Sequence, residues 1–169
     1  MARHIIGIGG VSRSGKTTLA HQLKAYMEDS GLSVRVLCQD DFVLAEDDLP
    51  YVGEHVDWET PESMDWDALL RALIRSSEAC DICIVEGIFA FHCKRINDYY
   101  TITVNLELEK EVFLERKKQD LRWGAEPDWY IAHIWKSHLK YRQIPAGCLK
   151  VRDAGLANPE KLARQLGLV

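Results

Sequence analysis

The segment from Gly10 to Thr17 has the residue types and the spacing of a phosphate-binding loop. It reads Gly10-Val11-Ser12-Arg13-Ser14-Gly15-Lys16-Thr17, which fits the pattern G-x-x-x-x-G-K-[ST]. Glycines permit backbone conformations and close approaches that a Cβ would block, so the N–H groups of the loop can converge on phosphate oxygens. The residues expected to contact the nucleotide are Gly10, Ser12, Ser14, Gly15, Lys16, Thr17 and Thr18.

Within this loop, Lys16 would reach the β- and γ-phosphates, and the Thr17 hydroxyl would bind Mg²⁺. The same pattern also occurs in glycine-rich turns that bind nothing. Here an apolar stretch, residues 4–9, precedes it, and an amphipathic helix expected over 16–30 follows it. That context favours nucleotide binding over an inert turn.

Two acidic residues follow predicted strands and could act on the bound phosphates. Asp40 comes directly after the strand expected over 33–38, and Glu86 ends the apolar strand expected over 82–85. Asp40 could accept a hydrogen bond from an acceptor hydroxyl and take its proton late in the reaction. Glu86 resembles a Walker B acid, with Glu in place of the usual Asp, and could help to hold Mg²⁺. Each could instead be an ordinary strand-end or turn acid.

Four basic residues lie on a helix expected over 110–122, which leads into a turn at Gly124. This arrangement is typical of a lid, here expected over 116–128. Arg116 and Arg122 are the candidates for covering phosphate oxygens, because a guanidinium fork suits them best. Lys117 and Lys118 are expected on a solvated basic face.

Strands and helices alternate along the whole chain. Strands are expected at 4–9, 33–38, 82–85, 101–106 and 149–151, and helices at 16–30, 61–79, 110–122, 129–142 and 159–166. This order predicts an α/β fold, a parallel sheet of about five strands with helices on both faces, in one domain over 1–169. Residues 43–60 lack a clear period and are expected to form a long functional loop. In such sheets, ligands bind at the carboxyl edge of the strands.

Composition limits the function further. The chain has 169 residues, 47% of them hydrophobic, and a net charge of −5, which disfavours a nucleic-acid partner. No apolar run approaches the ~20 residues of a membrane span, and no signal peptide is evident, so a cytoplasmic protein is expected. Five cysteines suggest no disulfide framework. Cys80 and Cys83 are expected on a strand, pointing to opposite faces, rather than in a redox motif.

Missing motifs narrow the class of nucleotide-binding protein. There is no N-K-x-D motif for guanine and no L-S-G-G-Q of the ABC type. The length argues against most motor or AAA cores with their accessory parts. What remains is a small kinase that transfers a phosphoryl group to a small acceptor.

Several segments together resemble the nicotinamide riboside kinase family, within the uridine kinase-like P-loop kinases. They are the strand and loop over residues 5–20, Gln39-Asp40-Asp41-Phe42, Val85-Glu86-Gly87, and Leu139-Lys140-Tyr141-Arg142-Gln143 after Trp135. The resemblance spans roughly residues 4–145. It implies a P-loop kinase fold and ATP- and Mg²⁺-dependent phosphorylation of a riboside 5′-hydroxyl, with nicotinamide riboside as the first candidate.

The resemblance also implies roles for individual residues. Asp40 would be the acid–base residue beside the 5′-hydroxyl, and Thr17 and Glu86 would bind Mg²⁺. Asp57 would grip the ribose 2′- and 3′-hydroxyls, next to His55 in the same substrate-binding segment.

Trp129 would lie against the base ring, where cation–π attraction favours a cationic nicotinamide. Val56 stands where animal members tend to have a second aromatic residue, so a pyrimidine nucleoside or another riboside would also fit such a pocket. The remaining tryptophans are expected to be packing residues: Trp58, Trp66, Trp123 and Trp135.

Three alternatives stay open at this point. The chain could be a uridine/cytidine kinase, another small-metabolite kinase of the same fold, or a nucleotide-binding regulatory module without catalysis. A monomer or a homodimer is expected, with a riboside and a nucleoside triphosphate as its small-molecule partners.

Overall fold

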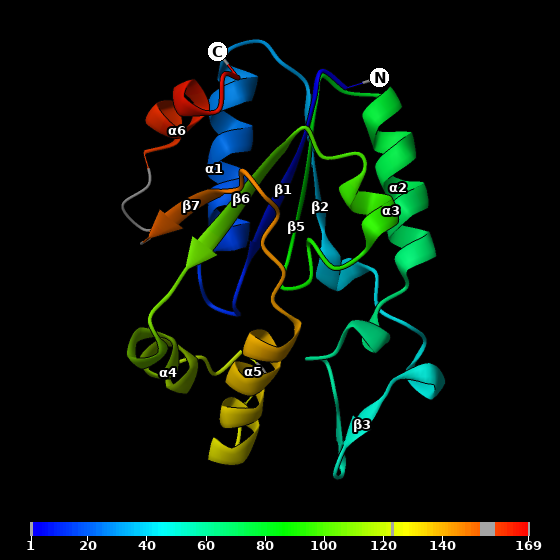
Figure 1. Cartoon of the computed structure of the whole chain (residues 1–169), viewed down its shortest axis with the longest axis vertical. Coiled ribbons are helices and arrows are strands. Elements are labelled where there is room, and N and C mark those ends of the chain that lie inside the picture. Colours follow the sequence, from blue (N-terminus) through cyan, green and yellow to red (C-terminus); the bar gives the residue numbers. More distant parts are fainter. Residues whose placement is uncertain (1, 123, 153–157, 169) are drawn as a thin grey trace.

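Five parallel strands form one sheet, in the spatial order β2-β5-β1-β6-β7. Their bounds are β1 His4–Gly10, β2 Val34–Cys38, β5 Ile82–Gly87, β6 Ile102–Glu107 and β7 Leu149–Arg152. The computed structural model describes residues 2–122, 124–152 and 158–168. The predicted α/β fold, with a parallel five-stranded sheet, is confirmed (Figure 1).

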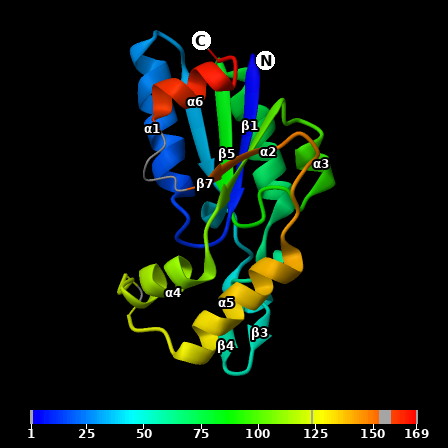
Figure 2. The same ribbon diagram turned by 60° about the vertical axis from the view of Figure 1, so that its left-hand side comes forward.

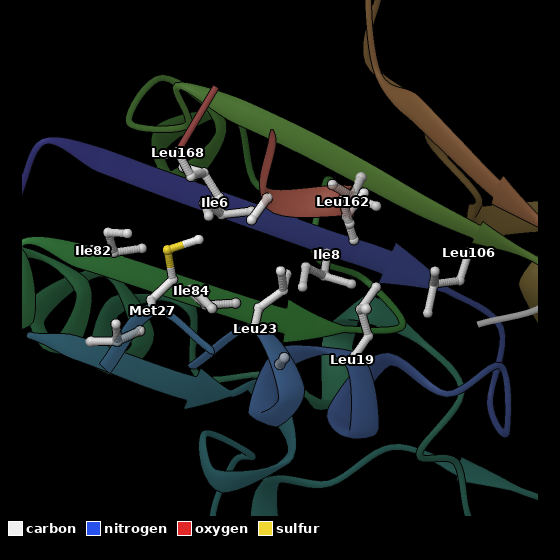
Figure 3. Close-up of a cluster of buried hydrophobic side chains, with 14 residues drawn as sticks. Ile6, Ile8, Leu19, Leu23, Met27, Ile82, Ile84, Leu106, Leu162 and Leu168 are labelled. Carbon is white, nitrogen blue, oxygen red and sulfur yellow. The ribbon is translucent and has the colours of Figure 1, made fainter. Parts of the chain in front are cut away.

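One face of the sheet packs against α1 (Lys16–Asp29) and α6 (Pro159–Gln165). Every second side chain of β1 and β5 points to this face, because side chains alternate along a strand. Ile6, Ile8 and Ile84 are completely buried there against Leu19 and Leu23 of α1 (Figure 3). The buried face of α1 fixes the position of the loop that immediately precedes it.

The opposite face packs against α2 (Trp66–Glu78) and α3 (Lys94–Asn97). Cys83 and Val85 of β5 are buried in this cluster, and Cys80 packs against it as well. The expectation that Cys80 and Cys83 point to opposite faces is therefore wrong, because Cys80 precedes the strand and alternation does not apply to it. Both are free thiols.

The side on which successive strands join the sheet switches at β1. From β1 the chain passes to β2 and β5 on one side, and it then crosses to β6 and β7 on the other. Such a switch point opens a crevice at the carboxyl ends of the strands. These ends point toward α4 (Lys110–Lys118) and α5 (Asp128–Tyr141), with the hairpin β3–β4 alongside α5 (Figures 1 and 2).

The long loop predicted over 43–60 has more structure than its sequence suggests. It contains a 3-10 turn, η2 (Glu46–Asp48), and a small antiparallel hairpin of β3 (Tyr51–Val52) and β4 (His55–Val56). Gly53 turns the hairpin with φ 61°, a conformation that glycine adopts without strain.

Three helix predictions need correction. Pro61 begins only a 3-10 turn, η3 (Pro61–Ser63), and α2 starts later because the Asp65 side chain caps it by accepting from Ala68 N at 2.8 Å. The helix α4 ends at Lys118 rather than at residue 122. The four-residue α3 was not predicted, since one turn shows no periodicity.

Among the described residues, the helices are too short or too polar to cross a bilayer.

The ends of β2 and β5 are held together by Gln39, in the 3-10 turn η1 (Gln39–Asp41). Its side chain is buried, and its Oε1 accepts a hydrogen bond from Phe89 N at 2.9 Å. The amide fills the space where a Cβ on Gly87 would lie, since that Cβ would be 2.7 Å from Gln39 Cδ. The neighbouring Asp40 and Glu86 therefore depend on a contact that requires glycine at 87.

Replacing Gly87 with Ala tests this contact. We expect Gly87→Ala to lower the free energy of unfolding by about 1–3 kcal/mol, because the added methyl overpacks against Gln39. In a Gln39→Gly background, which removes the Cβ of residue 39 as well as its amide, the same change should lose most of its cost, which gives a coupling energy of about 1–2 kcal/mol in urea unfolding. Additive costs would contradict the packing argument.

Candidate active site

The loop between β1 and α1 has the backbone geometry of an anion-binding turn. Gly10, Arg13 and Gly15 have φ of 149°, 64° and 94°. A Cβ on Gly10 would lie 2.7 Å from the carbonyl oxygen of Leu106 on the neighbouring strand. Only glycine fits there, so the sequence pattern has a direct steric cause.

The first turn of α1 presents unpaired N–H groups to this loop. Gly15 precedes the helix without a side-chain cap, and the ladder of the helix begins with Leu19 N donating to Gly15 O at 2.9 Å. The amides of Lys16, Thr17 and Thr18 come before that bond, so they are free for a phosphate. Ser14 is buried, and its Oγ has no hydrogen-bond partner among the described residues.

Lys16 is folded back into the loop. Its Nζ donates to Val11 O at 3.0 Å, and the side chain is buried. Burial lowers the pKa of Lys16, while Glu86 and Asp40 oppose that change. The predicted phosphate-binding lysine therefore lies within the charge field of both predicted acids. A phosphate can replace the Val11 carbonyl as its partner.

Thr17 and Glu86 form a ready pair of oxygen ligands. Thr17 Oγ1 donates to Glu86 Oε1 at 2.8 Å, and Glu86 is only 1% exposed at the end of β5. Among the described residues no group of three or more His, Cys, Asp or Glu could hold a metal. Mg²⁺ requires only one or two carboxylate contacts beside phosphates and water, so this hydroxyl–carboxylate pair fits it.

Asp40 lies in η1, at the carboxyl edge of the sheet. Although the residue is exposed at the rim, loss of water around its carboxylate raises the pKa of Asp40, and Lys16 opposes the rise. Glu86 and Asp41 add to it, and Arg122 also opposes it. A carboxylate with a raised pKa is a better proton acceptor than one in water.

Glu59 is a site residue that the sequence did not single out. It follows the hairpin and borders a small cavity with Val11, Ser12 and Phe89. Burial raises the pKa of Glu59 to about 7, and Lys117 and Lys16 act against that rise. Its neighbours Asp57 and Asp40 raise it further. Asp40, Asp57 and Glu59 therefore bring three carboxyl groups close together on this side of the site.

Asp57 is engaged by α5. Its Oδ1 lies 2.8 Å from His133 Nε2, so it tethers the hairpin segment to that helix. The adjacent His55 packs edge-on against Trp129, with 4.9 Å between ring centroids. The structure therefore brings three of the predicted substrate residues, His55, Asp57 and Trp129, to one junction between the hairpin and the start of α5.

Two tryptophans at this junction are exposed. Trp129 is 46% exposed and Trp58 is 44% exposed. The expectation that Trp58 is a packing residue is therefore wrong, whereas Trp66 and Trp135 do pack against buried clusters. Trp123 lies outside the described residues. Trp58 supplies a second aromatic surface two residues after Val56.

The four basic residues predicted for the lid have different surroundings. Arg116 reaches the phosphate-binding loop, where its NH1 donates to Arg13 O at 3.2 Å. Arg122 makes a two-pronged contact with Asp120, an acid that the sequence analysis did not select. Lys117 is only 7% exposed and pairs with Glu126 at 2.9 Å, so its expected place on a solvated face is wrong. Lys118 is exposed as predicted.

The last turn of α5 also borders the phosphate-binding loop. His138, Tyr141 and Arg142 line the small cavity shared with Ser12. Burial lowers the pKa of His138 to about 4, and the charges of Arg142 and Lys16 add to this effect. The Leu139–Gln143 motif marked this segment in the sequence but did not show which of its side chains face the loop.

Comparison with known proteins agrees with this geometry. A protein-family model described as AAA domain matches residues 6–122. Human nicotinamide riboside kinase 2 is 30% identical over 188 residues, covering 96% of this chain and 78% of that protein. The chain belongs to the AAA domain family and to the nicotinamide riboside kinase family. It is a phosphotransferase.

Other relatives extend the same group. Mouse nicotinamide riboside kinase 1 is 26% identical over 161 residues, with 85% of this chain and 80% of that protein covered. A uridine kinase of Leuconostoc citreum is 27% identical over 144 residues, with 69% and 68% covered.

Solved structures agree on the fold. A possible uridine kinase from Bacillus stearothermophilus has a TM-score of 0.57 at 23% identity, with 83% of this chain and 82% of that chain covered. A gluconokinase from Sinorhizobium meliloti has a TM-score of 0.58 at 16% identity, with 98% and 90% covered.

The raised pKa of Glu59 makes stability depend on pH. Its value of about 7 exceeds the ordinary 4.5, so its contribution to stability is complete below pH 4.5 and is lost as pH rises through 7. We expect Glu59→Gln to stabilise the ligand-free protein at pH 8 by roughly 1–3 kcal/mol. The difference should vanish near pH 4.5. Urea unfolding at several pH values measures it, with Glu54→Gln on the exposed hairpin as the control for loss of a surface charge. A difference independent of pH would contradict the assignment.

Proposed function

We propose that this protein transfers the γ-phosphoryl group of ATP to the 5′-hydroxyl of a riboside, with nicotinamide riboside as its substrate. One observation carries the proposal. The buried Lys16 lies within the field of Asp40 and Glu86, and Glu86 is already bonded to Thr17. This supports a site in which a phosphate-binding cation, a candidate metal pair and a proton acceptor lie around the end of one loop.

The residues divide the work of the reaction. The amides at the start of α1 and Lys16 hold the triphosphate, which fixes the direction of the terminal phosphorus. Bound Mg²⁺, held by Thr17 and Glu86, would neutralise charge on the phosphate oxygens. Asp40 accepts the proton of the riboside hydroxyl. The hydroxyl oxygen meanwhile forms a bond to the γ-phosphorus, and the bond between that phosphorus and the oxygen that leaves with ADP breaks. The raised pKa of Asp40 suits that role.

The acceptor side fits a ribose joined to a flat ring. A carboxylate can accept hydrogen bonds from two neighbouring hydroxyls, and Asp57 and Glu59 both lie on this side. We retain Asp57 for the ribose diol and place Glu59 beside it as a second candidate. Trp129, His55 and Trp58 supply exposed aromatic surface for the base. A cationic nicotinamide gains cation–π attraction from such surfaces.

A uridine or cytidine kinase is the second candidate. Val56 offers an aliphatic wall, and the Leuconostoc citreum relative is named a uridine kinase. The exposed Trp58 favours the cationic ring, because it restores an aromatic surface close to that position. A nucleotide-binding module without catalysis would have no use for Asp40, whose side chain has no hydrogen-bond partner in the part of the chain that the structure describes.

A panel of ribosides separates these functions. Nicotinamide riboside, uridine, cytidine and adenosine would each be incubated with ATP and Mg²⁺, and ADP release would be measured with a coupled assay. We expect kcat/KM for nicotinamide riboside to exceed that for uridine by at least about tenfold. Higher kcat/KM for uridine would reverse the substrate assignment. ATP binding without transfer to any riboside would leave the regulatory module.

Asp40→Asn isolates the proton acceptor. The change preserves shape but removes the basic oxygen, so kcat should fall by about 10²–10⁴-fold while the Kd for ATP changes little. The adjacent, exposed Asp41 gives a matched control, since Asp41→Asn removes the same charge one residue away. Turnover near the wild-type value in Asp40→Asn would remove Asp40 from the mechanism.

A further inference from the structure

We infer that Asp120 is a positioning residue, which holds the guanidinium of Arg122 in the orientation needed to meet the transferred phosphoryl group. The inference rests on the proposed function and deepens it. Asp120 follows the last turn of α4, where its side chain is only 3% exposed. An acid this deeply buried in a lid needs charged partners, and the structure gives it two.

The first partner is Arg122, whose guanidinium contacts both carboxylate oxygens of Asp120 along one of its edges. Arg122 Nε donates to Asp120 Oδ1 and Arg122 NH2 donates to Asp120 Oδ2, each at 2.8 Å. The Arg122 backbone N–H also donates to Oδ1, at 3.3 Å. These bonds hold the pKa of Asp120 well below its usual range, so the carboxylate stays charged throughout the working pH range.

The second partner is Arg13, in the phosphate-binding loop. Its NH1 lies 3.7 Å from Asp120 Oδ2. Arg13 is also the one residue other than glycine with a positive φ in the described part of the chain, and its carbonyl accepts from Arg116. A strained backbone conformation persists where surrounding contacts fix it. Two lid residues, Arg116 and Asp120, supply those contacts to Arg13. Asp120 thus connects the lid to the loop that binds phosphate.

The geometry of the guanidinium explains what this connection achieves. Arginine has five N–H donors on three nitrogens, and the contact with Asp120 uses the Nε–NH2 edge. The two N–H groups of NH1 have no partner among the described residues, which leaves them for phosphate oxygens. The charge of Arg122 opposes the rise in the pKa of Asp40, so the guanidinium lies within electrostatic reach of that carboxylate. Without Asp120, an Arg122 side chain that is 63% exposed would turn freely in solvent.

Binding of a planar mimic of the phosphoryl group tests the inference without any acceptor. In isothermal titration calorimetry, Asp120→Asn should weaken binding of ADP, Mg²⁺ and aluminium fluoride by about tenfold or more. Binding of ADP and Mg²⁺ alone should change by less than about threefold. Asp98→Asn breaks a comparable ion pair with Lys94 on the surface, far from the lid, and is the matched control.

A second variant guards against misfolding of the first. Arg122→Lys keeps the charge but loses the two-pronged contact, and its exposed side chain should not affect folding. It should weaken binding of the mimic to a similar extent, and the double variant should be no weaker than Arg122→Lys alone. Unchanged binding of the mimic, equal loss of ADP binding, or additive effects would overturn the inference.

Turnover distinguishes this inference from the proposed function. With the preferred riboside, Asp120→Asn should lower kcat about 10–100-fold and change the KM for ATP by less than about threefold. If the wild type phosphorylates no riboside but the effect on the mimic persists, the proposed function fails and the role of Asp120 stands. If the wild type is active and the mimic binds Asp120→Asn normally, the role of Asp120 fails alone.

Discussion

Unpaired backbone N–H groups at the start of α1 are the feature on which the rest of the site depends. They stay free because Gly10, Arg13 and Gly15 take left-handed or otherwise unusual conformations that turn the chain directly into the helix. The buried face of α1 then fixes that helix on the sheet. Lys16, Thr17 and the acids at the ends of the neighbouring strands can act on a phosphate only because this fixed set of donors holds it beside them.

Much of the fold could be predicted from the sequence because its signals are local. Apolar runs of four to seven residues and helices of 13 or 14 residues show clear periods, so β1, β5, α1 and α5 were found near their true bounds. Short elements carry no such signal, which is why α3 and the hairpin were missed. The start of α2 was misplaced because Pro61 and Asp65 are both plausible helix beginnings, and the hydrogen bond from Ala68 N to the Asp65 side chain, which only the structure shows, decides between them.

The candidate site divides in the same way. Asp40 and Glu86 follow directly from strand ends that meet at one edge, and the phosphate-binding loop follows from its motif. Glu59 and Asp120 could not be identified from the sequence, because they differ from other acids only in being buried beside cations from distant segments. Lys117 was assigned to solvent for the same reason, since its helix shows little amphipathic pattern. The motif at Leu139–Gln143 indicated a segment, but its contacts with the loop exist only in three dimensions.

The last helix shares its core with the first. Leu162 and Ala163 of α6 are buried in the same cluster as Leu19 and Leu23 of α1, and the two helices lie side by side on one face of the sheet (Figures 1 and 2). A ribosome makes the nucleotide-binding helix early, yet the surface that completes its burial is made near residue 163. Contacts this far apart in sequence slow folding and form late. The part of the apolar surface of α1 that α6 covers therefore stays exposed in the newly made chain until residues 162 and 163 have been synthesised.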